Sequence, residues 1–276
     1  MPSKVWIDGK LLDKNDAKIS VFDHGLLFGD GVWEGMRAYD GRVFKLHEHL
    51  DRLYQSAESL SLTIPVTHDE LAAAVVATLR ANDRSNGYVR VVVTRGPGTL
   101  GLDPRKCEPA VIVMAEDVVD YPRELYDAGL DVVLVPAIRY ESSHTSLSRA
   151  GVIAAKVAAL QAGCLDGILH DSQGAILGST DGAVFAVKDG LVSTHAVTQV
   201  TQAAVVAEVV AAGLTVGGAL TLEHLLSAPD EVFLVSTAAE VIAVRSIDGK
   251  PAGSGQEGPI TRKLRELYRV VVRRPD

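Results

Sequence analysis

Strand-type and helix-type hydrophobic patterns are interleaved along this chain without a regular β-α-β rhythm. This order favours an α+β fold over a doubly wound parallel sheet. β-Branched and alternating runs predict strands at 5–7, 32–39, 88–94, 110–114, 130–135, 167–170, 183–187, 231–235 and 241–246. Apolar residues spaced three and four apart predict helices at 47–60, 71–79, 151–162, 201–212 and 259–269.

The length of 276 residues allows one large domain or two smaller domains in close contact. The stretch 116–123 is acidic and polar and contains Pro122, so it is the predicted boundary. We therefore expect an N-terminal α/β domain at 1–118 and a C-terminal α+β domain at 119–276.

Composition narrows the functional classes. A net charge of −8 argues against nucleic-acid binding, which draws on clustered cationic side chains. The longest apolar stretch, 203–214, contains Glu208 and is too short to cross a bilayer. Cys107 and Cys164 are the only cysteines and lack metal-site spacing, so no metal is predicted. We expect a cytoplasmic protein without nucleic-acid or membrane partners.

Several motifs in one order carry a family resemblance. They are VFDHGLLFGDGVWEGMRAY at 21–39, KLHEHLDRL at 45–53, YVRVVVTRG at 88–96, FAVKDG at 185–190, DEVFLVSTAAEV at 230–241 and GPITRK at 258–263. Together they resemble the class IV aminotransferases, the fold-type IV enzymes of pyridoxal 5'-phosphate (PLP). This family includes branched-chain and D-amino-acid transaminases and aminodeoxychorismate lyase. The resemblance implies a two-domain α+β fold with an active cleft between the domains. It also implies a homodimer in which the loop 95–103 covers the neighbour's site.

The same resemblance assigns cofactor-binding roles. It makes Arg52 a ligand of the cofactor phosphate, a role that suits its fixed fork of donors. Thr201 begins a helix whose free amides favour an anion, and Thr237 with Ala238 forms a second anion-binding turn. The family's Gly-Ile-Thr-Arg pattern is here the sequence 199–202, QVTQ, which lacks the glycine.

Three positions depart from the family between the start of the polar run 142–149 and Phe185. With Lys156 aligned to the family's helical lysine, Thr145 takes the catalytic Schiff-base lysine position. Arg149 takes a nearby tyrosine position, and Gly178 takes that of the glutamate that contacts the pyridine nitrogen. A threonine hydroxyl replaces neither the amine nor its proton transfers, and glycine supplies no carboxylate.

Substitutes for the missing groups are limited. Lys156 lies eleven residues beyond Thr145, so in a mostly helical segment its backbone would be about 16 Å away. Asp181 follows Gly178 and is a candidate partner for a ring nitrogen. Arg149 has two interpretations, a structural ion pair or a ligand for a carboxylate or phosphate. His144 is either an ordinary histidine or a general acid or base.

The leading hypothesis is a repurposed enzyme that uses no PLP Schiff base and acts on a small anionic, carboxylate-bearing metabolite. Thr145, Arg149 and His144 are its candidate catalytic residues. No covalently bound cofactor is expected, and noncovalent PLP stays open. One alternative is a PLP-dependent aminotransferase or lyase that is either disabled by a substitution or uses an unusual base. The other is a noncatalytic ligand-binding homologue.

Overall fold

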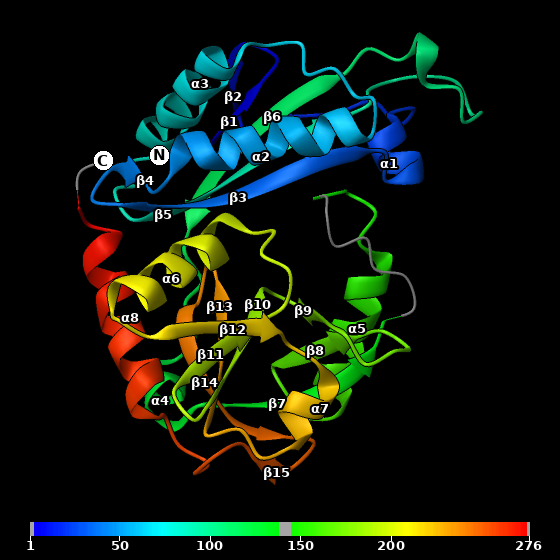
Figure 1. Ribbon diagram of the computed structural model, residues 1–276. Coiled ribbons are helices and arrows are strands. Elements are labelled where there is room, and N and C mark those ends of the chain that lie inside the picture. The colour runs from blue at the N-terminus through cyan, green and yellow to red at the C-terminus, as the bar shows by residue number, and fades with distance from the viewer. Residues whose placement is uncertain (1–2, 138–144, 275–276) are drawn as a thin grey trace. The chain divides into compact units, whose positions relative to one another are not determined.

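The computed structural model describes residues 3–137 and 145–274 and confirms the α+β fold (Figure 1). The chain folds into two compact units. The first unit contains residues up to 119 together with 145–149, and the second contains 120–137 and 150–274 among the described residues. No helix of the described residues is long and apolar enough to span a membrane.

The first unit is a six-stranded sheet with helices on one of its faces (Figure 1). The strand order is β2 (Lys10–Asp13), β1 (Lys4–Ile7), β6 (Ala110–Asp117), β5 (Gly87–Thr94), β3 (Gly31–Tyr39) and β4 (Arg42–Val43). The covering helices are α2 (Leu46–Ser59) and α3 (His68–Ala81), and the short α1 (His24–Phe28) precedes β3. A 3-10 turn, η1 (Pro104–Lys106), lies between β5 and β6.

Alternation along the strands explains which face α2 and α3 cover. Every second side chain of a strand points to the helices. Burial of each large aliphatic side chain there stabilises the folded state by about 1.5–3 kcal/mol. The core between sheet and helices includes Val32, Met36, Leu50, Leu53, Leu71, Val75, Leu79, Val89, Val91 and Val113. Residues of the opposite parity, such as Trp33 and Arg90, therefore point to the other face of the sheet.

Residues 145–149 join the first unit through the edge of β3. Strand β4 pairs with β3 only at Ala38 and Tyr39, which leaves the other end of that edge open. There the amide of Trp33 donates to the carbonyl oxygen of Thr145 at 2.8 Å. The amide of Leu147 donates to Gly31 at 2.9 Å. These bonds pair the free backbone groups at this edge of β3 and fix Thr145 beside the strand.

The second unit is built on a nine-stranded sheet. Eight strands follow the order β12 (Thr215–Ala219), β11 (Leu191–Thr194), β10 (Ala183–Lys188), β13 (Glu231–Ser236), β14 (Glu240–Ile247), β7 (Leu130–Pro136), β8 (Asp166–His170) and β9 (Ile176–Ser179). The ninth, β15 (Lys250–Pro251), pairs with β14.

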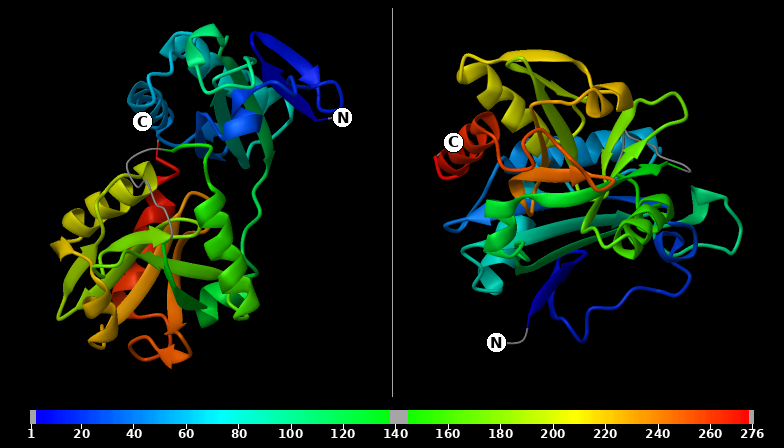
Figure 2. Two further views of the ribbon diagram at one scale, coloured as in Figure 1. Left: turned by 90° about the vertical axis from the view of Figure 1, so that its right-hand side faces the viewer. Right: turned by 90° about the horizontal axis from the view of Figure 1, so that it is seen from below.

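In the described part of the second unit, five helices accompany this sheet. They are α4 (Arg123–Ala128), α5 (Ala150–Gln161), α6 (Val200–Ala211), α7 (Leu222–Leu226) and α8 (Pro259–Val271). Helix α5 packs on β7 and β8, whereas α6 and α8 lie side by side (Figure 2). The long predicted helices and the buried strands are all present. The short helices α1, α4 and α7 were not predicted, because five or six residues do not complete two turns of a periodic pattern.

The start of α8 depends on a buried carboxylate. Glu231 accepts hydrogen bonds from the amides of Ile260 and Thr261 at 2.9 and 2.7 Å, and from the Thr261 hydroxyl at 2.6 Å. These amides belong to the first turn, which has no intrahelical acceptor, and the carboxylate also complements the helix dipole. Glu231 thereby joins β13 to α8.

We expect Glu231→Ala to lower the free energy of unfolding by about 2–3 kcal/mol, because charge-assisted bonds to buried amides are lost. Urea denaturation measures this change. Glu266→Ala on the exposed face of α8 is the matched control and should change stability little. Equal effects of the two substitutions would contradict the capping role of Glu231.

Candidate functional site

A buried carboxylate lies at the centre of the predicted site residues of the first unit. Glu34 on β3 is 2% exposed, and its Oε2 accepts from Nδ1 of His49 at 2.8 Å. Nη1 of Arg52 donates to the other carboxylate oxygen. His49 and Arg52 are three residues apart on α2, so both project from one face of the helix toward β3. A buried carboxylate requires such partners because its desolvation is costly.

Thr145 belongs to the same cluster. Its Oγ1 donates to Oε1 of Glu34 at 3.3 Å and lies 3.2 Å from Oγ of Ser56. Ser56 is one turn beyond Arg52 on α2, and its Oγ also accepts from the amide of Thr145 at 3.4 Å. The structure thus brings two sequence-predicted residues, Arg52 and Thr145, to one carboxylate.

Arg149 lies four residues after Thr145, at the end of the segment 145–149. Its Cζ is 4.8 Å from the centroid of the Trp33 ring, within the range of a cation–π contact. His144, the third predicted catalytic residue, is outside the described residues, so its role stays a prediction.

Three predicted anion-binding residues lie in the second unit. Oγ1 of Thr201 in the first turn of α6 is 3.1 Å from Oγ1 of Thr237, which follows β13 in the same turn as Ala238. Gln199, the residue before α6, provides no side-chain hydrogen bond to the first turn. Two hydroxyls beside an uncapped helix start form an arrangement that can hold a phosphate or carboxylate.

Gly178 is buried within β9, opposite Leu169 of β8. Its φ of 141° lies in a region that L-residues rarely adopt, so a glutamate at this position would carry backbone strain of about 1–3 kcal/mol. Asp181, the predicted substitute, forms an ion pair with Lys156, whose Nζ also donates to the carbonyl of Leu165 at 2.6 Å. Lys156 and Asp181 therefore connect α5 to the turn after β9.

His195 is a buried residue that the sequence did not single out. It follows β11, is 5% exposed, and its Nε2 has no hydrogen-bond partner among the described residues. Burial lowers the pKa of His195 to about 4, so its imidazole is neutral at pH 7. The side chain of Gln202 on α6 donates to Thr194 at 3.0 Å and to the His195 carbonyl at 3.3 Å, which fixes this loop.

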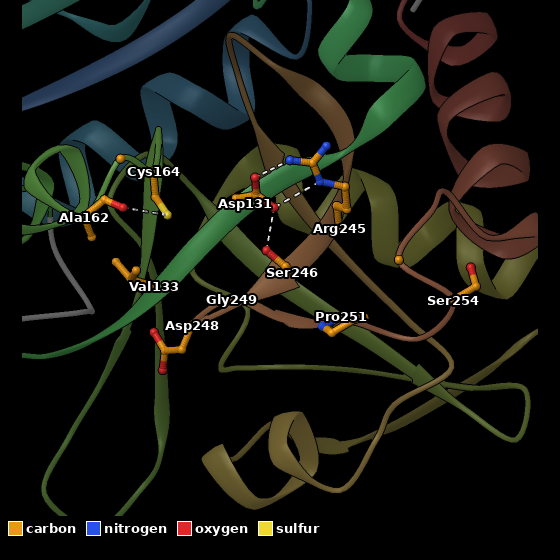
Figure 3. A pocket seen from close by; sticks show the side chains of 12 residues that line it. Asp131, Val133, Ala162, Cys164, Arg245, Ser246, Asp248, Gly249, Pro251 and Ser254 are labelled. Atoms are coloured by element: carbon orange, nitrogen blue, oxygen red, sulfur yellow. Dashed lines mark hydrogen bonds and ion pairs between the residues drawn. The ribbon is translucent and has the colours of Figure 1, made fainter.

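A cavity of about 770 Å³ in the second unit contains none of the predicted site residues (Figure 3). Asp131 and Arg245 face each other across part of its lining, and Nε of Arg245 donates to Asp131 at 3.0 Å. The hydrogen bonds from Arg245 lower the pKa of Asp131, so both groups are charged and paired with each other. Cys164 also lines the cavity, and burial raises the pKa of its thiol, which disfavours the reactive thiolate. The clusters at Glu34 and Thr201 are therefore the better candidates.

Comparisons with known proteins identify the family. A family model described as Amino-transferase class IV matches residues 31–247. The chain is 42% identical to a Methanocaldococcus jannaschii protein named "Putative branched-chain-amino-acid aminotransferase", over 97% of this chain and 96% of that protein. It is 33% identical to a Staphylococcus haemolyticus D-alanine aminotransferase, over 96% of each chain.

The chain belongs to the class IV aminotransferase family. The solved branched-chain aminotransferase of the archaeon Thermoproteus uzoniensis, with norvaline, matches with a TM-score of 0.90. That match has 31% sequence identity and covers 98% of this chain and 95% of the other. A branched-chain amino acid aminotransferase solved with pyridoxamine 5'-phosphate matches all of this chain with a TM-score of 0.92 and 30% identity. The resemblance inferred from the motifs and the α+β aminotransferase fold are both confirmed.

Within this class IV aminotransferase chain, sequence reasoning missed Glu34, His49 and Ser56. A signal was available for each of them. His49 and Ser56 share the helical face of Arg52, at spacings of three and four residues. Glu34 shares the strand parity of the core residues Val32 and Met36, where an acidic residue needs a buried partner.

We expect the stability of this class IV aminotransferase homologue to fall as the pH drops from 6.5 to 4. The unfolded chain protonates His195 near pH 6.5, whereas the folded chain resists protonation until about pH 4. The loss attributable to His195 approaches about 3 kcal/mol at the lower pH. Urea denaturation at several pH values measures it.

His195→Gln should reduce the slope of the unfolding free energy against pH, by up to the slope that uptake of one proton on unfolding produces. Val197→Ala alters the same loop without changing an ionisable group and should keep the wild-type slope. An unchanged slope in His195→Gln would show that His195 is not the titrating group.

Proposed function

We propose that this class IV aminotransferase homologue does not attach PLP covalently and acts as an enzyme on a small carboxylate-bearing metabolite. The observation that carries the proposal is the position of Thr145. A hydroxyl, hydrogen-bonded to Glu34 and Ser56, lies at the residue that the family resemblance aligns with the Schiff-base lysine. A hydroxyl cannot form the imine by which a lysine amine attaches the cofactor.

The groups of this chain fit a phosphate better than they fit covalent PLP. Thr201 and Thr237, with the uncapped first turn of α6, could hold a phosphate in the second unit. When bound, PLP supplies an electron sink. The resemblance places Gly178 where a carboxylate would support that function, and Lys156 is engaged by Asp181 and Leu165. No step of the proposed reaction runs through PLP.

Glu34 and His49 can act on a ligand only through Thr145. Both are nearly fully buried on the helix-covered side of β3, where Glu34 accepts a hydrogen bond from the Thr145 hydroxyl. Arg149 supplies a guanidinium of the first unit that could bind the carboxylate of a ligand. We therefore propose that the Thr145 hydroxyl and Arg149 meet the bound acid, and that Glu34 holds the hydroxyl in position.

Incubation with PLP followed by borohydride should leave no pyridoxyl group on a residue of the Glu34 cluster. Peptide mass spectrometry locates any modification. Thr145→Lys is the matched variant, because it restores an amine at this position, and it should become modified at residue 145. Reproducible trapping at one specific lysine of the wild-type protein would contradict the proposal.

A PLP-dependent aminotransferase is the second candidate. It is favoured by relatives named branched-chain and D-alanine aminotransferases over nearly the whole chain. This candidate predicts transfer of the amino group to a 2-oxo acid above a control without enzyme. The proposed function predicts none.

We also propose that the chain forms a homodimer through an apolar surface of the first unit. Leu100 and Leu102 are 72% and 77% exposed, and Phe22 and Leu26 are exposed as well. The two segments are joined, because the amide of Gly98 donates to Phe22 at 3.0 Å. Contiguous exposed apolar side chains of this kind often mark a protein–protein interface.

Leu100→Asp combined with Leu102→Asp should shift the protein from dimer to monomer in analytical ultracentrifugation, because a buried interface does not accommodate unpaired charges. Leu226→Asp introduces a charge at an exposed leucine of the second unit and should leave the dimer intact. A wild-type monomer, or a double variant that stays dimeric, would refute this interface.

A further inference from the structure

A cysteine and a buried histidine are in contact in the first unit, where the chain between β5 and β6 passes α1. Sγ of Cys107 lies 3.6 Å from Nδ1 of His24. The other ring nitrogen of His24, Nε2, is 2.7 Å from the carbonyl oxygen of Thr99. His24 is 1% exposed, whereas Cys107 is half-buried. The fold thus places a partly accessible thiol against an imidazole.

The hydrogen-bond partners define the roles of the two ring nitrogens. The carbonyl oxygen of Thr99 can only accept, so Nε2 of the neutral ring carries the proton and donates it. Nδ1 is then an acceptor, and the Cys107 thiol donates to it. A nucleophile, a base and a group that orients the base follow one another in this order. Proteins activate thiols and hydroxyls with the same order of groups.

The surroundings of the ring hold it in this position. The amide of His24 donates to the carbonyl of Gly96 at 3.0 Å, and the imidazole packs edge-on against Phe28 with 4.9 Å between the ring centroids. A Cβ atom on Gly98 would lie 2.5 Å from Sγ of Cys107 and 2.6 Å from Nε2 of His24. The backbone at Gly98 therefore lies against both groups and helps to keep them in contact.

The environment of Cys107 makes a base necessary for reaction at neutral pH. Burial raises the pKa of the Cys107 thiol, which disfavours the nucleophilic thiolate. Among the charged groups near it, one guanidinium lowers this pKa and three carboxylates raise it further: Arg95 against Asp30, Asp23 and Asp103. The imidazole of His24 can take the proton as the sulfur attacks, so the free thiolate need not form first.

Cys164 is the other cysteine of the chain and provides an internal comparison. It is also half-buried, and burial raises the pKa of its thiol as well. Its Sγ lies 3.9 Å from the carbonyl oxygen of Ala162, which takes no proton at neutral pH. A difference in reactivity between the two thiols therefore reports on the contact with His24.

We propose that Cys107 and His24 form a nucleophilic thiol site that reacts with small disulfides, referred to below as the Cys107 site. Sγ attacks one sulfur of a disulfide R–S–S–R, Nδ1 of His24 takes the thiol proton, and the S–S bond of the reagent breaks. The leaving thiolate takes this proton from His24 and departs as R–SH. The sulfur of Cys107 is oxidised to the mixed disulfide Cys107–S–S–R, and the departing half is reduced.

The Cys107 site goes beyond the proposed function, because it uses none of the residues around Glu34, Arg149 or Thr201. Its product is reversible, since a free thiol can displace the attached half and restore Cys107. The site makes the first unit responsive to the thiol–disulfide balance of its surroundings.

The test measures how fast bis(2-hydroxyethyl) disulfide, an uncharged probe, adds to each cysteine of the full chain. Cys164→Ser leaves Cys107 as the only cysteine, and Cys107→Ser is the matched variant that leaves Cys164. Intact-protein mass spectrometry follows the addition, and dithiothreitol should reverse it. At pH 7 we expect Cys107 to react at least about tenfold faster than Cys164, because a positioned base assists it.

The pH profile distinguishes assistance by a base from easier access of the probe. Between pH 8 and pH 7 an unassisted thiol of raised pKa loses about tenfold in rate, because its thiolate fraction falls tenfold. Cys164 should show this loss. Cys107 should lose about twofold or less, because its proton passes to an imidazole that is mostly neutral over this range.

His24→Gln in the Cys164→Ser background removes the base but keeps an amide that can donate to Thr99. It should slow the reaction of Cys107 about tenfold and give it the pH profile of Cys164, with circular dichroism reporting on the fold. Equal rates of the two cysteines at pH 7 would overturn the inference, as would a tenfold loss for Cys107 between pH 8 and pH 7. An undiminished rate in folded His24→Gln would also overturn it. If His24→Gln does not fold, the pH profile of Cys164→Ser decides alone.

Discussion

The buried carboxylate of Glu34 organises the candidate site of the first unit. It lies on the helix-facing side of β3, where a lone charge would be costly, and it is stabilised by His49 and Arg52 from α2. Thr145 completes this arrangement with a hydroxyl. The carboxylate of Glu34 thus contacts both helix α2, through His49 and Arg52, and the segment 145–149, through Thr145.

Much of the fold followed from the sequence because its elements are long and strongly patterned. The helices α2, α3, α5, α6 and α8 each complete three turns or more, enough to establish an apolar face. Residues 145–147 were harder, because their partner is the edge of β3, more than a hundred positions away. A polar run gives no local signal of such pairing, since the bonds are made by backbone groups.

The candidate site was predictable only in part. The motifs supplied Arg52, Thr145, Arg149, Thr201 and Thr237, and the structure pairs Arg52 and Thr145 through Glu34 and Thr201 with Thr237. The interpretation of Asp181 as a ring-nitrogen partner is disfavoured, because its carboxylate is engaged by Lys156. His195 was missed because its low pKa comes from burial, and the sequence around it does not indicate that the side chain is buried.

The proposed function combines the confirmed family fold with a changed reactive centre. The backbone of Gly178 suits glycine and would strain a larger residue, which supports the proposal that the change extends beyond residue 145. A crystal structure of wild-type protein grown with PLP tests the central claim most directly. The account predicts that any density for the cofactor is separate from every side chain, with the Thr145 hydroxyl still on Glu34. Continuous density between the cofactor and a lysine side chain would contradict it.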